Sequence, residues 1–229
     1  MKRIGILAAA GAPVAVVALL AAPAFAGAQT KVSFRVEGAT KTLLPAKTVT
    51  VPSNGSITKG GAPKGSCPEA GTAAGALNVA THGDWTGKDF SFGIEVDSIL
   101  GEKVNNSSRY WELFDNNHAA STGICDLKVK AGDQLLFASV PTRGKQYPIL
   151  IKAPSSAIVG KPFQVKAYYY RSASNATTPL AGVSVTGVTG KTNAKGVLTV
   201  TTSKAGKLSL VGSKLGEIRS AAATVTVSK

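Results

Sequence analysis

The sequence is poor in cysteine, histidine and aromatic residues, and these shortages exclude several classes of site. It has two cysteines and two histidines among 229 residues, too few for the usual zinc centres. It contains no Gly-x-Ser-x-Gly turn, no phosphate-binding glycine loop and no calcium loop. No pair of carboxylates stands out for acid and base chemistry. We therefore expect no metal site, no cofactor and no enzyme activity.

Acidic residues are almost absent from the chain after residue 145. From residue 146 onward there are 11 basic residues and a single acid, Glu217, whereas residues 31–145 carry 13 basic and 11 acidic residues. Such a positive field favours contact with an anionic polymer, here one of the cell envelope, or a membrane surface; the alternative is that it only maintains solubility. The lysines are scattered and no nucleic-acid-binding motif occurs, so no specific nucleic acid is expected as a partner.

Long apolar runs are also absent, apart from one near the start of the chain. Residues 4–22 are apolar, with two basic residues before them and small residues after them. This order predicts a secretory signal peptide over residues 1–26, cleaved after Ala26 or after Ala28. The alternative is a retained membrane anchor, but glycine and prolines interrupt the run. We expect a mature protein without a transmembrane segment that is secreted, extracellular or loosely associated with the cell envelope.

Both cysteines lie in the exported part of the chain. An oxidising compartment makes a bridge the default, so we predict a disulfide between Cys67 and Cys125. A metal site would need more ligands than two thiols and the two widely separated histidines, His82 and His118. Each histidine lies in a polar turn and is interpreted as a surface residue.

Hydrophobic periodicity predicts a first module of strands around one helix. Alternating apolar residues at 32–36 and 48–51 indicate an opening hairpin. Small apolar residues at helical spacing predict a helix that begins at Pro68 and ends before Gly83. Further strands are predicted at residues 90–96, 110–114 and 134–138, with turns at 99–101, 115–117 and 132–133. Two strands, a helix and further strands follow one another in the order of a β-grasp-like module.

Several motifs of this module occur together in a known type of exported domain. They are Cys67-Pro68, Gly75-Ala76-Leu77, Tyr110-Trp111, Asn116-Asn117, Gly123-Ile124-Cys125 and Gly132-Asp133. With them, residues 31–141 resemble an exported domain of unknown function related to the transcobalamin C-terminal domain. Two positions depart from the family, which usually has an apolar residue in place of Asp115 and often glycine in place of Asn117. In vitamin carriers this domain works beside a helical-barrel domain that the sequence lacks, so the resemblance does not imply cobalamin binding.

Residues 146–229 are predicted to form an immunoglobulin-like β-sandwich without cysteines. Strand-like runs punctuated by glycines lie at residues 149–151, 163–167, 183–185, 197–200, 208–210 and 224–227. The segments 179–183 and 192–196 resemble bacterial immunoglobulin-like repeats, which serve as surface spacers and adhesin stalks. The expected fold class is mainly β: a disulfide-stapled β-grasp-like α+β module with one helix, then a sandwich.

Aromatic side chains are the remaining candidates for ligand recognition, because Trp and Tyr combine rigid apolar area with a polar edge. Trp85, Tyr110 and Trp111 are the candidates, together with Asn116 in the adjacent turn. Neighbouring residues of a strand point to opposite faces, which places one of Tyr110 and Trp111 in the core and leaves the other free for partial exposure. We favour core packing of both rings over exposure of one. The run of tyrosines at 168–170 also places at least one ring outward.

The sequence thus predicts a noncatalytic secreted or envelope-associated binding protein. The first module would bind a small ligand or a protein partner, neither of which the sequence identifies. The basic second module would contact an anionic envelope polymer. The alternative is a purely structural extracellular spacer or adhesion module without a small-molecule ligand.

Overall fold

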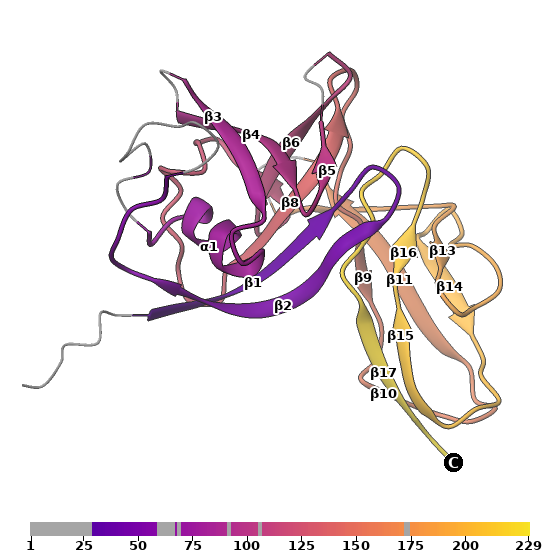
Figure 1. The fold of residues 1–229 in the computed structure, drawn as a ribbon. Helices are drawn as coiled ribbons and strands as arrows, with labels where there is room; N and C mark the ends of the chain where they lie inside the picture. The colour runs from indigo at the N-terminus through magenta and orange to yellow at the C-terminus, as the bar shows by residue number, and fades with distance from the viewer. Residues whose placement is uncertain (1–28, 59–66, 68–69, 91–92, 105–106, 172–174) are drawn as a thin grey trace, which may run out of the picture.

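The described part of the protein is mainly β, with one helix and one disulfide, and its strands fall into two halves (Figure 1). The computed structural model describes residues 29–58, 67, 70–90, 93–104, 107–171 and 175–229. The predicted signal peptide and Pro68 lie outside these residues. Among the described residues, no helix has the length and apolar character needed to span a membrane.

The N-terminal half, residues 29–141, combines two sheets with the helix. Its elements are β1 (Gln29–Glu37), β2 (Thr42–Pro52), α1 (Ala73–Ala80), β3 (Trp85–Phe90), β4 (Gly93–Ile99), β5 (Glu102–Lys103), β6 (Arg109–Asp115), β7 (His118–Ala119) and β8 (Gln134–Pro141). The larger sheet has the order β2-β1-β8-β6-β7, and the smaller has the order β3-β4-β5. β1 and β8 pair in parallel, which brings the first and last strands of this half together at the centre of the larger sheet.

The helix begins later than the sequence predicted. We expected it to start at Pro68, but α1 starts at Ala73, because the Thr72 side chain accepts a hydrogen bond from the Gly75 N–H at 3.4 Å and caps the helix. Ala70 lies in a bend, where its N–H donates to the Gly55 carbonyl at 3.0 Å. A Cβ at position 75 would lie 1.7 Å from the Ala70 oxygen, so this approach of bend and helix requires glycine.

The strand predicted over residues 90–96 is two strands. β3 ends at Phe90 and β4 begins at Gly93, and these two residues face each other in an antiparallel hairpin. The period-two pattern continues across the turn, so alternation alone did not reveal the reversal. Gly93 has a φ of +110°, which only glycine adopts easily. Ser91 and Phe92 lie outside the described residues.

Other predicted features of this half are confirmed. The opening hairpin is β1 and β2. β6 turns into β7 through Asn116 and Asn117, which have φ angles of +50° and +68°, as expected for a two-residue hairpin turn. The disulfide joins Cys67 and Cys125 across a separation of 58 residues. Such a bridge fits an oxidising compartment.

The C-terminal half, residues 146–229, has short strands around a second core. They are β9 (Leu150–Lys152), β10 (Ser156–Ile158), β11 (Phe163–Tyr170), β12 (Thr177–Pro179), β13 (Ser184–Val185), β14 (Val197–Val200), β15 (Gly206–Leu210), β16 (Gly212–Ser213) and β17 (Ala223–Ser228). β12, β11, β14 and β9 form one sheet, and β10, β17 and β15 form another. Val165 and Ala167 of β11 share a core with Val225 and Val227 of β17, so the two sheets enclose one apolar layer. The sequence did not predict β10, β12 and β16.

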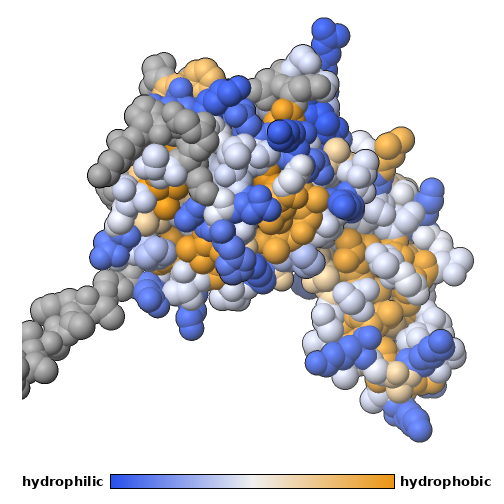
Figure 2. Space-filling view, in the orientation of Figure 1, coloured by the Kyte–Doolittle hydropathy of each residue, from blue (hydrophilic) through white to orange (hydrophobic). Residues whose placement is uncertain are grey.

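The two halves are docked against each other. Leu135 and Phe137 of β8 face the first core, whereas Leu136 and Val140 point to the opposite face of the sheet and pack with Ile218 of the C-terminal half. β8 is therefore covered on both faces. Hydrophilic side chains are spread over both halves on the face shown in Figure 2.

A candidate binding cleft between the two halves

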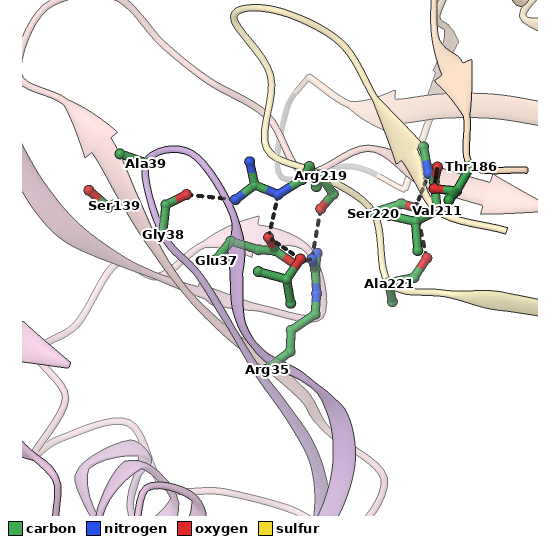
Figure 3. Close-up of polar contacts among 12 residues, drawn as sticks. Arg35, Glu37, Gly38, Ala39, Ser139, Thr186, Val211, Arg219, Ser220 and Ala221 are labelled. Atoms are coloured by element: carbon green, nitrogen blue, oxygen red, sulfur yellow. Dashed lines mark hydrogen bonds and ion pairs between the residues drawn. The ribbon is translucent and has the colours of Figure 1, made fainter. Parts of the chain in front are cut away.

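A buried cluster of charges joins the halves (Figure 3). The carboxylate of Glu37, at the end of β1, is 2% exposed and accepts hydrogen bonds from Arg35 Nη1 at 3.1 Å and Arg219 Nε at 2.9 Å. Thr42 Oγ1 donates to the same carboxylate at 2.9 Å. Arg35 Nη1 also donates to the Arg219 carbonyl at 2.7 Å, and Arg219 Nη2 to the Gly38 carbonyl at 2.7 Å. Two arginines and one carboxylate thus fix the orientation of the halves.

Burial sets the electrostatics of this cluster. Loss of solvation lowers the pKa of Arg35, while the charge of Glu37 and the hydrogen bond to it oppose the change. A guanidinium keeps its proton in proteins, so both arginines stay charged. The two positive charges repel each other, so the cluster depends on the negative charge of Glu37 to offset them.

The connection between the halves is also held by hydrogen bonds. The N–H of Ile149 donates to the Ile218 carbonyl at 2.9 Å, and the N–H of Ile218 donates to the Tyr147 carbonyl at 3.0 Å. The N–H of Tyr147 donates to Glu217 Oε2 at 2.9 Å. Burial raises the pKa of Glu217, and this hydrogen bond opposes the increase. The connecting segment is therefore fixed in place at Tyr147.

A cleft of about 310 Å³ opens beside this connection, and we call it the junction cleft. Both halves and the connecting segment contribute to its wall. The side chains used in the argument below are Tyr110, Glu112, His118, Lys145, Tyr147, Tyr170 and Arg171. A cleft of this size, lined by aromatic rings with a few charged groups, has the composition of a small-ligand site.

Stacked rings form one wall of the junction cleft. His118 of β7 stacks on Tyr170 of β11, with ring centroids 4.8 Å apart and planes 19° from parallel. His118 Nε2 lies 3.1 Å from Asn175 Oδ1, a second contact between the halves. Because one ring comes from each half, the wall exists only in the docked arrangement.

Tyr169 faces away from the cleft and anchors the end of β11. It is buried, its ring lies 5.0 Å from that of Tyr147, and its hydroxyl accepts a hydrogen bond from Arg171 Nη2 at 2.8 Å. That hydrogen bond and the nearby Tyr169 raise the pKa of Arg171. The anchoring of Tyr169 fixes the backbone on either side of it, and so the position from which Tyr170 reaches the cleft.

Tyr110 and Glu112 form another, partly polar part of the cleft wall. They are two residues apart in β6 and lie on the same face of the sheet. Burial raises the pKa of Glu112, while its hydrogen bond with Tyr110 and the charge of Lys145 partly oppose the increase. Burial and the neighbouring Glu112 raise the pKa of Tyr110. The tyrosine thus stays neutral and can donate to the carboxylate or to a ligand.

The raised pKa of Glu112 predicts a pH-dependent effect of Glu112→Gln. A carboxyl whose pKa is higher in the fold than in the unfolded chain destabilises the fold when ionised. Gln removes the charge and retains an acceptor for Tyr110, so the free energy of unfolding should rise at neutral pH. The gain should disappear as the pH falls through the raised pKa of Glu112. Urea unfolding across pH measures it, with Asp89→Asn on the exposed end of β3 as the control; a gain that persists in acid would contradict the prediction.

The four predicted ligand residues have different positions. Tyr110 is 36% exposed and lines the junction cleft. Trp85 and Trp111 are buried in the first core; Trp85 Nε1 donates to Asn78 Oδ1 at 3.2 Å, and Trp111 Nε1 has no partner in the part of the chain that the structure describes. The favoured expectation that both rings at 110 and 111 pack in the core is wrong for Tyr110, because its ring lies on the face of β6 that lines the junction cleft.

Asn116 supports the β6–β7 turn. Its Oδ1 accepts a hydrogen bond from the Gln134 N–H at 3.1 Å, and its Nδ2 donates to Asp115 Oδ1 at 2.9 Å. Burial and the charge of Asp133 raise the pKa of Asp115. These contacts give Asn116 a structural role in joining the turn to the start of β8.

Sequence reasoning missed most of the cleft. The outward tyrosine in the run 168–170 was noted, but Tyr147 lies in the segment between the predicted modules, and Glu112 and Arg171 had no distinguishing motif. His118 was interpreted as a surface turn residue. These side chains come together only because the halves dock, and the sequence pattern of a single segment does not indicate which surfaces dock.

A second, more polar cavity of about 460 Å³ also lies at the junction. Its lining includes Glu37 and Arg219 of the buried cluster, and Lys191 and Lys214 from the C-terminal half. Arg109 also lines it and is held by Ser139, to which its Nε donates at 2.9 Å. Glu37 and Glu217 partly offset the positive charges of its lysines and arginines, so the cavity has mixed charge. No described aromatic residue lines it. Within the described ranges, no group of three or more His, Cys, Asp and Glu side chains is arranged to hold a metal ion.

Comparison by sequence finds no matching protein-family model and no matching curated protein. Similar solved structures include haptocorrin in complex with Cbi, with 21% identity over 50% of this chain and a TM-score of 0.39. The match spans 25% of the haptocorrin chain. Another is a proposed metal-binding protein from Ruminococcus gnavus ATCC 29149, with 10% identity over 50% of this chain and 99% of that one, and a TM-score of 0.36. The transcobalamin-related and immunoglobulin-like assignments remain predictions.

Proposed function

We propose that this chain is an exported, noncatalytic binding protein that holds a small ligand in the junction cleft and contacts an anionic envelope polymer through its C-terminal half. The observation that carries the proposal is the cleft of about 310 Å³ walled by His118, Tyr170 and Tyr110. Aromatic rings with hydroxyl groups at their edges suit sugar rings and flat heterocycles.

The polar groups of the cleft support binding over catalysis. Glu112 is hydrogen-bonded to Tyr110, and His118 is stacked on Tyr170 with Nε2 directed at Asn175. A nucleophile oriented by a neighbouring base, which covalent catalysis requires, is not formed by these side chains. Fixed groups of this kind orient a ligand.

Export is supported by the apolar N-terminal segment and the disulfide. Association with the envelope is supported by the charge of the C-terminal half, where Glu217 is the single acid. This acid accepts the Tyr147 N–H and lies at the junction, so the rest of that half is uniformly basic.

Binding measurements on cleft variants test the proposal. The mature protein would be screened by calorimetry against soluble mono- to tetrasaccharides and heterocyclic vitamins, and any hit measured with Tyr170→Ala. Loss of a stacking wall should weaken binding by about tenfold, whereas Tyr170→Phe, which keeps the ring, should bind nearly normally. Leu215→Ala, in the second cavity, controls for effects outside the cleft. Hits that Tyr170→Ala leaves unchanged would contradict the assignment to this cleft.

A purely structural role is the second candidate, favoured by one observation. The Arg35–Glu37–Arg219 cluster and the apolar contact around Ile218 make the junction a fixed one, as a spacer requires. Absence of any ligand in the screen, together with absence of envelope binding, would favour the spacer.

A further inference from the structure

Three lysines surround one tyrosine on the outer face of the sheet that contains β11. Lys152, Lys166 and Lys195 line a hollow of about 320 Å³ together with Tyr168 and Thr177. All three lysines are exposed, and no ion-pair partner is found for them among the described residues. We call them the lysine cluster. The single acid of this half, Glu217, does not line the hollow.

The pairing of the strands brings two of these charges together. Lys166 of β11 lies directly opposite Lys152 of β9, so the two side chains project from the same face of the sheet. Like charges at directly opposite positions destabilise a sheet. An anion placed between them would relieve this repulsion, which makes the pair a recognition feature.

The third lysine is held in position by its turn. Asn193 Oδ1 accepts hydrogen bonds from the N–H groups of Lys195 at 2.9 Å and Val197 at 3.1 Å. The Gly196 carbonyl accepts the Ala167 N–H of β11 at 2.8 Å. A Cβ at Gly196 would lie 2.4 Å from the Ala167 oxygen, so the turn approaches β11 as closely as glycine allows. The backbone at Lys195 is therefore fixed beside β11 before a ligand arrives.

Aromatic rings lead from the lysine cluster to the junction cleft. Tyr168 and Tyr170 lie on one face of β11, with ring centroids 6.2 Å apart in an edge-to-face arrangement, and Tyr170 stacks on His118. Burial and the nearby Tyr170 raise the pKa of Tyr168, so its hydroxyl stays neutral. A row of rings beside fixed positive charges suits a chain of sugars that carry acidic groups.

We propose that the lysine cluster and Tyr168 bind one repeating unit of an anionic polysaccharide, with its phosphate or carboxylate between the lysines and its sugar ring against Tyr168. This inference rests on the proposed envelope association and assigns it to one site. Adjacent units of the polymer would follow the tyrosine row toward the junction cleft.

The test compares two triple variants of the mature protein. Lys152→Gln/Lys166→Gln/Lys195→Gln removes the cluster, and Lys161→Gln/Lys204→Gln/Lys207→Gln removes three exposed lysines elsewhere in the same half. Binding is measured by calorimetry across a salt series to polygalacturonate, which carries carboxylates, and to a sugar-phosphate polymer. The cluster variant should lose about tenfold in affinity and the control less than about twofold. Which polymer binds more tightly identifies the acidic group.

Tyr168→Ala separates stacking from charge. It should weaken binding of both sugar polymers and leave binding of inorganic polyphosphate, which has no rings, unchanged; Tyr168→Phe should behave like the unaltered protein. Equal losses on all three polymers would overturn the contact with a sugar. Far-UV circular dichroism shows whether each variant keeps its fold.

The outcomes distinguish this site from the proposed function. Equal, salt-sensitive losses in the two triple variants would overturn the local site and leave envelope association by general charge. Failure of the unaltered protein to bind either polymer at low salt would overturn both the site and the envelope association. Selective loss in the cluster variant supports the site.

Discussion

Replacing Glu37 with Gln should lower the free energy of unfolding by about 3 kcal/mol, because it leaves the buried guanidinium of Arg35 and the partly buried one of Arg219 without a counter-charge. The carboxylate is 2% exposed and contacts both Arg35 and Arg219. Gln keeps the shape of the side chain and can still accept a hydrogen bond from Thr42 Oγ1, so the loss of stability measures the contribution of the charge. Urea unfolding followed by circular dichroism measures it.

The control for this variant is Asp89→Asn, which also removes one carboxylate charge but at an exposed position. It should change stability by less than about 0.5 kcal/mol. Because the cluster spans the junction, Glu37→Gln should also uncouple the halves, and two unfolding transitions should replace one. A loss below about 1 kcal/mol with one transition would show that the cluster does not hold the halves together.

Removing the disulfide with Cys67→Ala/Cys125→Ala should cost about 4 kcal/mol, from the chain entropy of closing a loop with a separation of 58 residues. Both cysteines are buried in the first core, so lost packing adds to this cost. The measurement is urea unfolding of the double variant and of the unaltered protein.

The location of the bridge gives this prediction a second readout. The bridge ties Cys67, whose backbone pairs with that of Ile57, to Cys125. The carbonyl of the preceding residue, Ile124, accepts a hydrogen bond from the Ala74 N–H of the helix at 2.9 Å. Hydrogen exchange should therefore accelerate first at the start of α1 and remain slow in β11 and β17. Uniform acceleration over both halves, or a stability loss under about 1 kcal/mol, would contradict this account.

Local pattern predicted much of the fold. Alternation located β1 and β2, strand-like runs between turn signals located β6, β8 and most strands of the C-terminal half, and the Asp115-Asn116-Asn117 run located a turn. These signals depend only on neighbouring residues. The start of the helix was wrong because proline was given priority over Thr72, a better N-cap. The β3–β4 reversal was missed because alternation has the same period on both sides of a turn.

The binding cleft could be predicted only in part. Tyr110, Trp85 and Trp111 were all chosen for their chemistry, with core packing favoured for Tyr110 and Trp111. Trp85 and Trp111 are buried, whereas Tyr110 is exposed at the cleft. His118 and Tyr170 are 52 positions apart in the sequence and stack through docking of the halves. The same holds for Glu37 and Arg219, whose ion pair joins residues 182 positions apart. Contacts of this range depend on how surfaces fit, which periodicity and composition do not encode.

The most direct test of the central claim is an NMR titration of the ¹⁵N-labelled mature protein with an oligosaccharide or vitamin found in the binding screen. Binding in the junction cleft predicts amide shift changes at residues 110–119, 144–147 and 169–171, from both halves and at the same ligand concentration. Changes confined to one half, away from Tyr110 and Tyr170, would contradict the claim that the docked halves form the binding site.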